Sequence, residues 1–83
     1  MDILSPLRQP ANRKVGAKQV MRAISEGRAV KVFIARDAEP GIVQPVLTAS
    51  DTHKIEIIWV DSMRKLGDAC AIDVAASVAA LLG

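Results

Sequence analysis

The sequence predicts a single α/β domain in which helices cover both faces of a sheet. Three observations support this fold class. Short apolar runs that are typical of buried strands alternate with segments of helical period. The strand candidates are apolar along most of their length, which indicates that both faces of the sheet are covered. With 83 residues, the chain is long enough for one hydrophobic core and too short for two.

The first predicted helix follows an N-terminal arm. Residues 1–12 hold two prolines and show no periodicity, so we expect a flexible or loosely docked arm, with the domain occupying residues 13–83. From residue 17 apolar side chains recur every three or four positions, which predicts a helix that ends near Gly27. The entry residue, Gly16, has no side chain to cap the free N–H groups of the first turn. The apolar stripe leaves an exposed polar flank formed by Lys18, Gln19 and Arg22.

The following elements alternate between strands and helices. Residues 29–35 are rich in β-branched and apolar side chains and predict a buried strand, which residues 37–41 end. Residues 42–52 have helical spacing, provided that Pro45 falls within the first turn. Residues 55–60 predict a second strand, and Asp61 or Ser62 then caps a short helix that stops between residues 67 and 71. The alanine-rich residues 74–82 fit a helix or a buried strand equally well by period.

Charge is unevenly distributed along the chain. Residues 1–36 hold eight Lys and Arg against two acidic residues, whereas residues 37–83 hold three against seven. This imbalance suggests a basic face toward an anionic partner, with ordinary solvated surface charge as the alternative. No apolar run reaches the roughly 18–20 residues of a membrane span, and the first residues lack a signal-peptide pattern. We therefore expect a cytoplasmic protein with no membrane partner.

Catalysis and metal binding find little support in the sequence. The common phosphate-loop, dinucleotide, nucleophile-elbow and zinc-protease motifs are absent. Cys70 stands among apolar residues, where a thiol is usually inert, and a lone cysteine forms no internal disulfide. His53 lies in a polar connection and is expected at the surface, while Trp59 fits a half-buried packing residue better than a base-stacking platform. We expect no enzyme, cofactor or metal site.

The start of the first helix is a candidate anion site. Its free N–H groups and the positive end of its dipole favour phosphate. Lys18 can donate to guanine O6 and N7, Gln19 offers a donor and an acceptor on one amide, and Arg22 can hold a phosphate or stack on a base. Taken alone, these side chains also fit a solvated flank. Gly16 favours the binding site, because a bare entry residue permits close approach by another molecule.

Three ordered blocks resemble a known family. The segments GAKQVMR, VFIARDAEP and VDSMRKLGDACAIDV resemble the archaeal-type ribosomal protein L7Ae family, which binds kink-turn RNA, and most closely its short bacterial paralogues. The resemblance runs from about residue 14 to residue 82. It implies a three-layer α/β/α sandwich around a four-stranded mixed sheet, with the alanine-rich tail as a strand. It also implies binding, without catalysis, of a kink-turn: an RNA helix bent at a bulge that is followed by tandem sheared G·A pairs.

The resemblance assigns candidate RNA-binding residues by position. The element that would contact the sheared guanines and the adjoining backbone matches Gly16, Lys18, Gln19 and Arg22. The D-x-E-P turn places Glu39, together with Val43, near the flipped-out nucleotide. A loop that closes over this nucleotide matches residues 62–74, with Lys65, Leu66, Ala69, Ile72 and Asp73 as participants. The alternative for this segment is a helix terminus packed into the core, and we expect Leu66 and Cys70 to pack there in either case.

Four positions depart from the family pattern. Lys18 and Gln19 stand where many relatives have Asn and Glu, which adds a positive charge and should strengthen nonspecific attraction to RNA. Met63 replaces a frequent lysine, and Ala71 replaces a frequent glycine of the closing loop, where a positive φ would favour glycine.

The expected partner is a kink-turn in a ribosomal or regulatory RNA, bound by a monomeric protein that belongs to the ribosome or associates with it. Other ribonucleoprotein components are possible further partners. The alternative is a protein-interaction subunit of a ribonucleoprotein that keeps the fold without RNA specificity and docks through the apolar closing loop.

Overall fold

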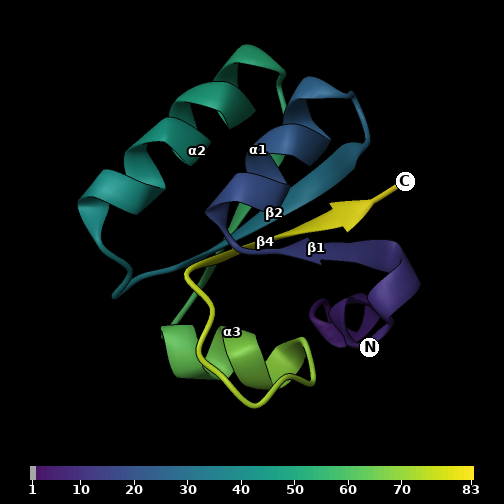
Figure 1. Ribbon diagram of the computed structural model, residues 1–83, viewed down its shortest axis with the longest axis vertical. Helices are drawn as coiled ribbons and strands as arrows, with labels where there is room; N and C mark the ends of the chain where they lie inside the picture. Colours follow the sequence, from purple (N-terminus) through teal and green to yellow (C-terminus); the bar gives the residue numbers. More distant parts are fainter. Residues whose placement is uncertain (1) are drawn as a thin grey trace.

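The chain folds into three layers, with a sheet between two helices on one side and one helix on the other (Figure 1). The computed structural model describes residues 2–83. The sheet consists of β1 (Arg13–Val15), β2 (Ala29–Ala35), β3 (Glu56–Val60) and β4 (Val78–Leu82), in the order β1-β4-β2-β3. Strand β4 is antiparallel to β1 and β2, and β2 is parallel to β3. The predicted α/β/α sandwich with a four-stranded mixed sheet is confirmed.

Helices α1 (Ala17–Ser25) and α2 (Pro40–Thr52) cover one face of the sheet, and α3 (Met63–Ala69) covers the other (Figure 1). Helix α2 begins at Pro40, two residues before the predicted start, because the fixed φ of proline suits the first helical position. Pro45 therefore lies in the second turn and not in the first, where the sequence required it. Within residues 2–83 no helix is long and apolar enough to cross a membrane.

The core lies around the two central strands. Val32, Phe33 and Ile34 of β2 are fully buried, as are Ala79 and Ala80 of β4. The alanine-rich tail is a strand from residue 78 onward because it pairs with β1 on one side and with β2 on the other. Residues 74–77, which share its composition, instead complete the loop between α3 and β4.

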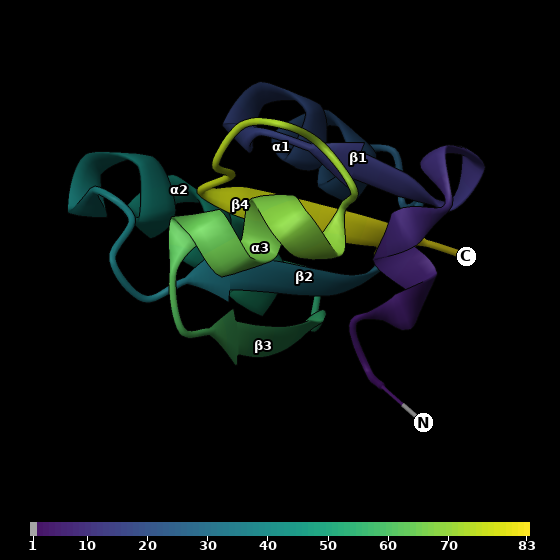
Figure 2. The same cartoon turned by 90° about the horizontal axis from the view of Figure 1, so that it is seen from below.

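Residues 2–12 dock on the domain, whereas the sequence left open a flexible or a loosely docked arm for residues 1–12. Two short 3-10 helices, Ser5–Arg8 and Pro10–Asn12, each have a proline in their first turn. The side chain of Leu7 is fully buried in the core. The first of these 3-10 helices contacts α3 on the same side of the sheet (Figure 2). Burial of the Leu7 side chain thus holds the segment on the domain, and no periodicity in the sequence predicted this contact.

All three helices begin at one edge of the sheet. Strands β1, β2 and β3 run in the same direction, because β4 is antiparallel to β1 and β2 while β3 is parallel to β2. Each of these three strands is followed by a helix, so their carboxyl ends and the helix N-termini meet at one edge, on the left in Figure 1. We call this the carboxyl edge. In open α/β sheets, ligands bind at such an edge.

Candidate nucleic-acid interface

In the part of the chain that the structure describes, two of the three helix N-termini at the carboxyl edge have no side-chain cap. Gly16 is the N-cap residue of α1, and Glu39 is that of α2, but its carboxylate caps no N–H group. Neither helix has an acidic residue in its first turn. The free N–H groups and the positive dipole ends of α1 and α2 are therefore available to an anionic or hydrogen-bonding ligand.

Helix α3 differs because its N-terminus is already satisfied. The Oγ of Ser62 accepts a hydrogen bond from the Lys65 backbone N–H at 3.0 Å. The Oδ1 of Asp37 accepts one from the Met63 backbone N–H at 2.7 Å. Asp37, which belongs to the D-x-E-P turn after β2, thus joins that turn to the start of α3. This side chain has a structural role that the sequence pattern did not reveal.

Backbone hydrogen bonds hold the start of α1 beside the α3–β4 loop, residues 70–77. The Gly16 N–H donates to the Val78 carbonyl at 3.0 Å, and the Ala35 N–H donates to the Ser77 carbonyl at 2.9 Å. On the other side, the Ala76 N–H donates to the Met63 carbonyl at 3.0 Å. The loop is therefore fixed between the ends of β1 and β2 and the first residue of α3.

Gly16 adopts a conformation that other residues rarely reach. Its φ is +95°, in the region that favours glycine. Among the described residues, no heavy atom beyond the neighbouring residues in the chain lies within 4 Å of the place where a Cβ would stand. Backbone conformation, and not internal crowding, therefore requires the glycine, and the space beside it is open to another molecule.

The predicted polar flank of α1 is exposed. Lys18, Gln19 and Arg22 all lie at the surface in the first two turns of the helix. Gln19 and Arg22 also line a hollow of about 190 Å³ together with two cations that the sequence interpretation did not include, Lys14 and Arg28. Lys14 precedes Gly16 by only two residues, and this nearness in sequence could have indicated that Lys14 belongs to the site. Arg28 had no comparable signal.

The α3–β4 loop presents apolar and polar side chains together. Ile72 and Asp73 line a second hollow, of about 410 Å³, with Arg64 and Val74. The side chain of Val74 is 68% exposed, the largest exposed fraction among the exposed large apolar residues within residues 2–83. A Cβ at Gly67 would overlap the Val74 carbonyl oxygen, so this glycine permits the loop to cross close to α3.

Other predicted residues lie elsewhere. Leu66 is fully buried against the sheet, so its side chain offers no surface to a nucleotide, and Val43 is only 8% exposed. Lys65 and Ala69 line a hollow on the flank of α3 that faces the N-terminal residues. Arg64, one residue earlier, is the cation on the loop side. The sequence could not show which flank of α3 the returning loop would follow.

Cys70, His53 and Trp59, each the single residue of its type in the chain, have surroundings typical of packing or surface residues. Burial raises the pKa of the Cys70 thiol, and the nearby Arg13 guanidinium opposes this shift. The Nη2 of Arg13 donates to the Cys70 carbonyl at 2.8 Å, so this cation stabilises the end of α3 instead of joining an exposed basic face. His53 is exposed at the C-cap of α2. Trp59 is 43% exposed, with the Arg36 guanidinium carbon 5.7 Å from its ring centroid.

Comparison with known proteins identifies relatives of this geometry. A model of the "Ribosomal protein L7Ae/L30e/S12e/Gadd45 family" matches residues 3–82. A curated RNA-binding protein of Geobacillus sp. (strain WCH70) is 42% identical over 74 residues, which cover 89% of this chain and 90% of that protein. One from Halalkalibacterium halodurans is 44% identical over 73 residues, which cover 88% and 89%.

Solved structures include a similar fold. The structure of the Giardia lamblia 15.5kD RNA binding protein superimposes with a TM-score of 0.89 at 27% sequence identity. The match covers 98% of this chain and 71% of the Giardia protein.

Proposed function

The chain belongs to the ribosomal protein L7Ae/L30e/S12e/Gadd45 family, and from this premise we propose that it recognises kink-turn RNA at the carboxyl edge of its sheet. The relatives described above carry the name RNA-binding protein, which supports binding and not catalysis as the function. The proposed target is a ribosomal or regulatory RNA in the cytoplasm, bound by one copy of the chain.

One observation carries the proposal: two uncapped helix N-termini share an edge with an exposed cationic and amide flank. RNA is recognised by proteins chiefly at unstacked bases and at the backbone beside them. The free N–H groups of α1 can bind a phosphate or a base edge, while Gln19 offers a donor and an acceptor to a purine. Lys18 adds a charged donor suited to guanine O6 and N7.

The α3–β4 loop supplies the opposite wall of the proposed cleft. A nucleotide flipped out of the kink exposes both faces of its base, and Ile72 and Val74 can cover one of them. Glu39, exposed at the start of α2, can accept a hydrogen bond from the base edge. Leu66 and Val43 support the walls from the core.

Binding to matched RNAs tests this function. We expect the protein to bind a kink-turn RNA at least tenfold more tightly than the same RNA with its tandem G·A pairs replaced by Watson–Crick pairs, in gel shift or calorimetry at fixed salt. Gln19→Ala should weaken kink-turn binding by about tenfold, because one well-oriented base contact contributes roughly 1–3 kcal/mol. Gln44→Ala, an exposed glutamine on α2, is the matched control. Equal affinity for the two RNAs would refute kink-turn recognition.

A protein-docking role remains as a second candidate because of Val74. Its 68% exposure leaves apolar surface on the loop that a protein could cover. This candidate predicts that a protein co-purifies with the chain after nuclease treatment and that Val74→Ser releases it. Loss of all partners after nuclease treatment would exclude it.

A further inference from the structure

We propose that the flank of α1 carries a second RNA contact, a site for backbone phosphates formed by Lys14, Arg22 and Arg28. This inference rests on the proposed function. It extends the contact surface from the nucleotides of the kink to a stem that leads away from them.

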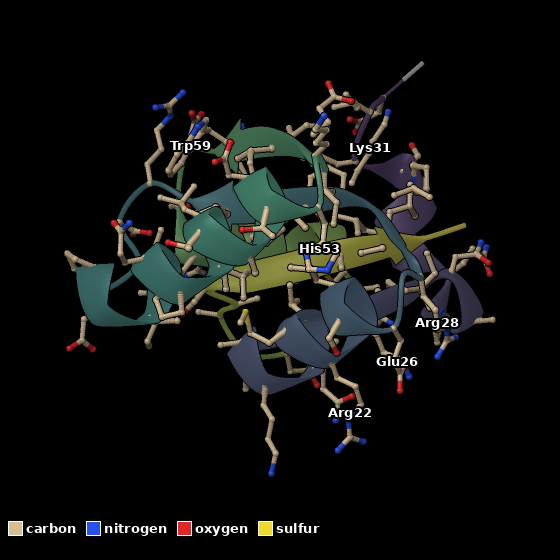
Figure 3. The ribbon with its side chains drawn as sticks, turned by 90° about the horizontal axis from the view of Figure 1, so that it is seen from above. Arg22, Glu26, Arg28, Lys31, His53 and Trp59 are labelled. Carbon is tan, nitrogen blue, oxygen red and sulfur yellow. The ribbon has the colours of Figure 1, made fainter. Side chains whose placement is uncertain are left out.

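The three cations come from different elements and meet at one hollow. Lys14 belongs to β1, Arg22 to α1 and Arg28 to the turn before β2. Figure 3 shows Arg22, Glu26 and Arg28 along one side of α1, whereas Lys31 and Trp59 lie on the opposite side of the molecule. The hollow at which the three cations meet has a volume of about 190 Å³ and is lined by Lys14, Gln19, Arg22, Ala23, Glu26 and Arg28.

The charges in this hollow are poorly neutralised by the protein. Its only acidic lining residue, Glu26, lies 3.8 Å from Arg28 through Oε1 and Nη1, and both side chains are about half exposed, at 49% and 53%. Such an exposed ion pair contributes little to the stability of the fold. Lys14 and Arg22 have no ion-pair partner in the part of the chain that the structure describes. Two guanidinium groups and an ammonium can therefore bind phosphate oxygens with strong, charge-assisted hydrogen bonds.

The position of the hollow joins it to the proposed cleft. Gln19, a candidate base-reading residue, lies at one end, and Glu26 lies two turns further along the same face of α1. At 1.5 Å per residue these two positions are about 10 Å apart along the helix axis, enough for more than one phosphate of a strand. A backbone that enters at Gln19 would continue along the flank toward Arg28.

Replacement of Glu26 tests the proposal by the direction in which RNA affinity changes. Its carboxylate competes with phosphate for the Arg28 guanidinium and repels the RNA backbone, so it should reduce affinity. Glu26→Gln should therefore strengthen binding, whereas a residue that merely supports the fold would weaken binding when replaced. Arg28→Gln leaves the turn intact, because the backbone of residue 28 is held at both ends by hydrogen bonds to the Ala23 carbonyl and the Gly83 N–H.

The test measures affinity against salt for a kink-turn RNA with two long stems, for versions with each stem shortened, and for the G·A-disrupted RNA. At about 0.15 M salt we expect Arg28→Gln and Lys14→Gln each to weaken binding to the long RNA roughly three- to tenfold, and to reduce the slope of log K against log salt by about one. Glu26→Gln should tighten binding about two- to threefold. Lys31→Gln, on the opposite side, is the control and should change neither quantity.

Three results distinguish the proposals. If Arg28→Gln and Lys14→Gln lower affinity for kink-turn and disrupted RNA by the same factor, and the effect disappears when one particular stem is shortened, the phosphate site is supported. An unchanged salt slope in Arg28→Gln, weaker RNA binding by the Glu26→Gln variant, or an effect that persists whichever stem is shortened would overturn it. If the wild-type protein binds both RNAs equally, kink-turn recognition fails, while the same variants still decide the phosphate site on that nonspecific binding.

Discussion

Replacing Ala71 with glycine should stabilise the protein. Ala71 follows α3 with a φ of +58°, and its N–H donates to the Asp68 carbonyl at 2.9 Å, while the Ile72 N–H donates to the Gly67 carbonyl at 3.2 Å. These two bonds form a Schellman motif, whose left-handed residue is most often glycine. Helix α1 ends in the same way with Gly27 at a φ of +71°. Ala71 also departs from the family pattern, which has a frequent glycine at this position.

The expected gain is the difference between two effects. A non-glycine residue in the left-handed region costs roughly 1–2 kcal/mol, because its Cβ crowds the following carbonyl. Glycine in turn adds conformational entropy to the unfolded chain, which costs about 0.4–1 kcal/mol. The Ala71 side chain is exposed, so no buried contact is lost. The net stabilisation is therefore about 0.5–1 kcal/mol, which for a domain of this size corresponds to a rise in Tm of roughly 2–8 °C.

Thermal unfolding followed by circular dichroism, and urea unfolding with an unchanged m-value, would measure this gain. The control is Ala75→Gly, an exposed alanine of the same loop whose φ is not positive, for which we expect a loss of about 0.4–1 kcal/mol. Lys54→Gly repeats the test at the end of α2, where φ is +56°. If Ala71→Gly lowers Tm as much as Ala75→Gly does, the left-handed conformation of Ala71 does not destabilise the folded protein, and the reasoning is wrong.

Four further predictions concern the core and the loop. Ser50→Ala should raise the free energy of unfolding by about 1 kcal/mol in urea titration, because the buried Ser50 Oγ has no hydrogen-bond partner among residues 2–83, and a decrease would contradict this. Gly67→Ala should lower stability by roughly 1–3 kcal/mol and weaken RNA binding, because the new Cβ displaces the Val74 carbonyl; unchanged affinity would separate the loop from the RNA site. The Cys70 thiol should resist alkylation at pH 8 until urea unfolds the protein, since burial raises its pKa. For the same reason stability should fall as the pH rises past the ordinary thiol pKa, because the unfolded state releases the proton first, and a flat profile in that window would refute the shift.

Local pattern was sufficient to predict most elements of the fold. The spacing of apolar residues predicted α1, apolar runs predicted the strands β2 and β3, and the cap at Asp61 or Ser62 predicted α3, all with bounds close to the observed ones. The uncapped entry at Gly16 and the cap at Ser62 were also evident, because helix ends are specified by one or two neighbouring residues. Helix α2 was predicted two residues too short, since Pro40 belongs to the helix and the breaking turn precedes it.

The candidate site was predicted in part. The flank of Lys18, Gln19 and Arg22 is exposed, as the helical period required. The side chain of Leu66 is fully buried, as expected for a helix end packed into the core, so it offers no surface to a nucleotide. The basic face suggested by the charge imbalance gathers only some of the N-terminal cations, because Arg13 turns inward to the end of α3.

By itself the sequence determined the alternation of helices and strands, the single core and the bare entry to α1, because each depends on residues a few positions apart. Tertiary structure decided what depends on where the chain returns. Pairing with β1 and β2 makes residues 78–82 a strand, the path of the α3–β4 loop brings Arg64 and not Lys65 to its side, and an apolar site in the core draws in Leu7. Lys14 and Arg28 likewise meet beside Gln19 only after β1, α1 and the following turn have packed together, because residues from separate elements become neighbours through folding alone.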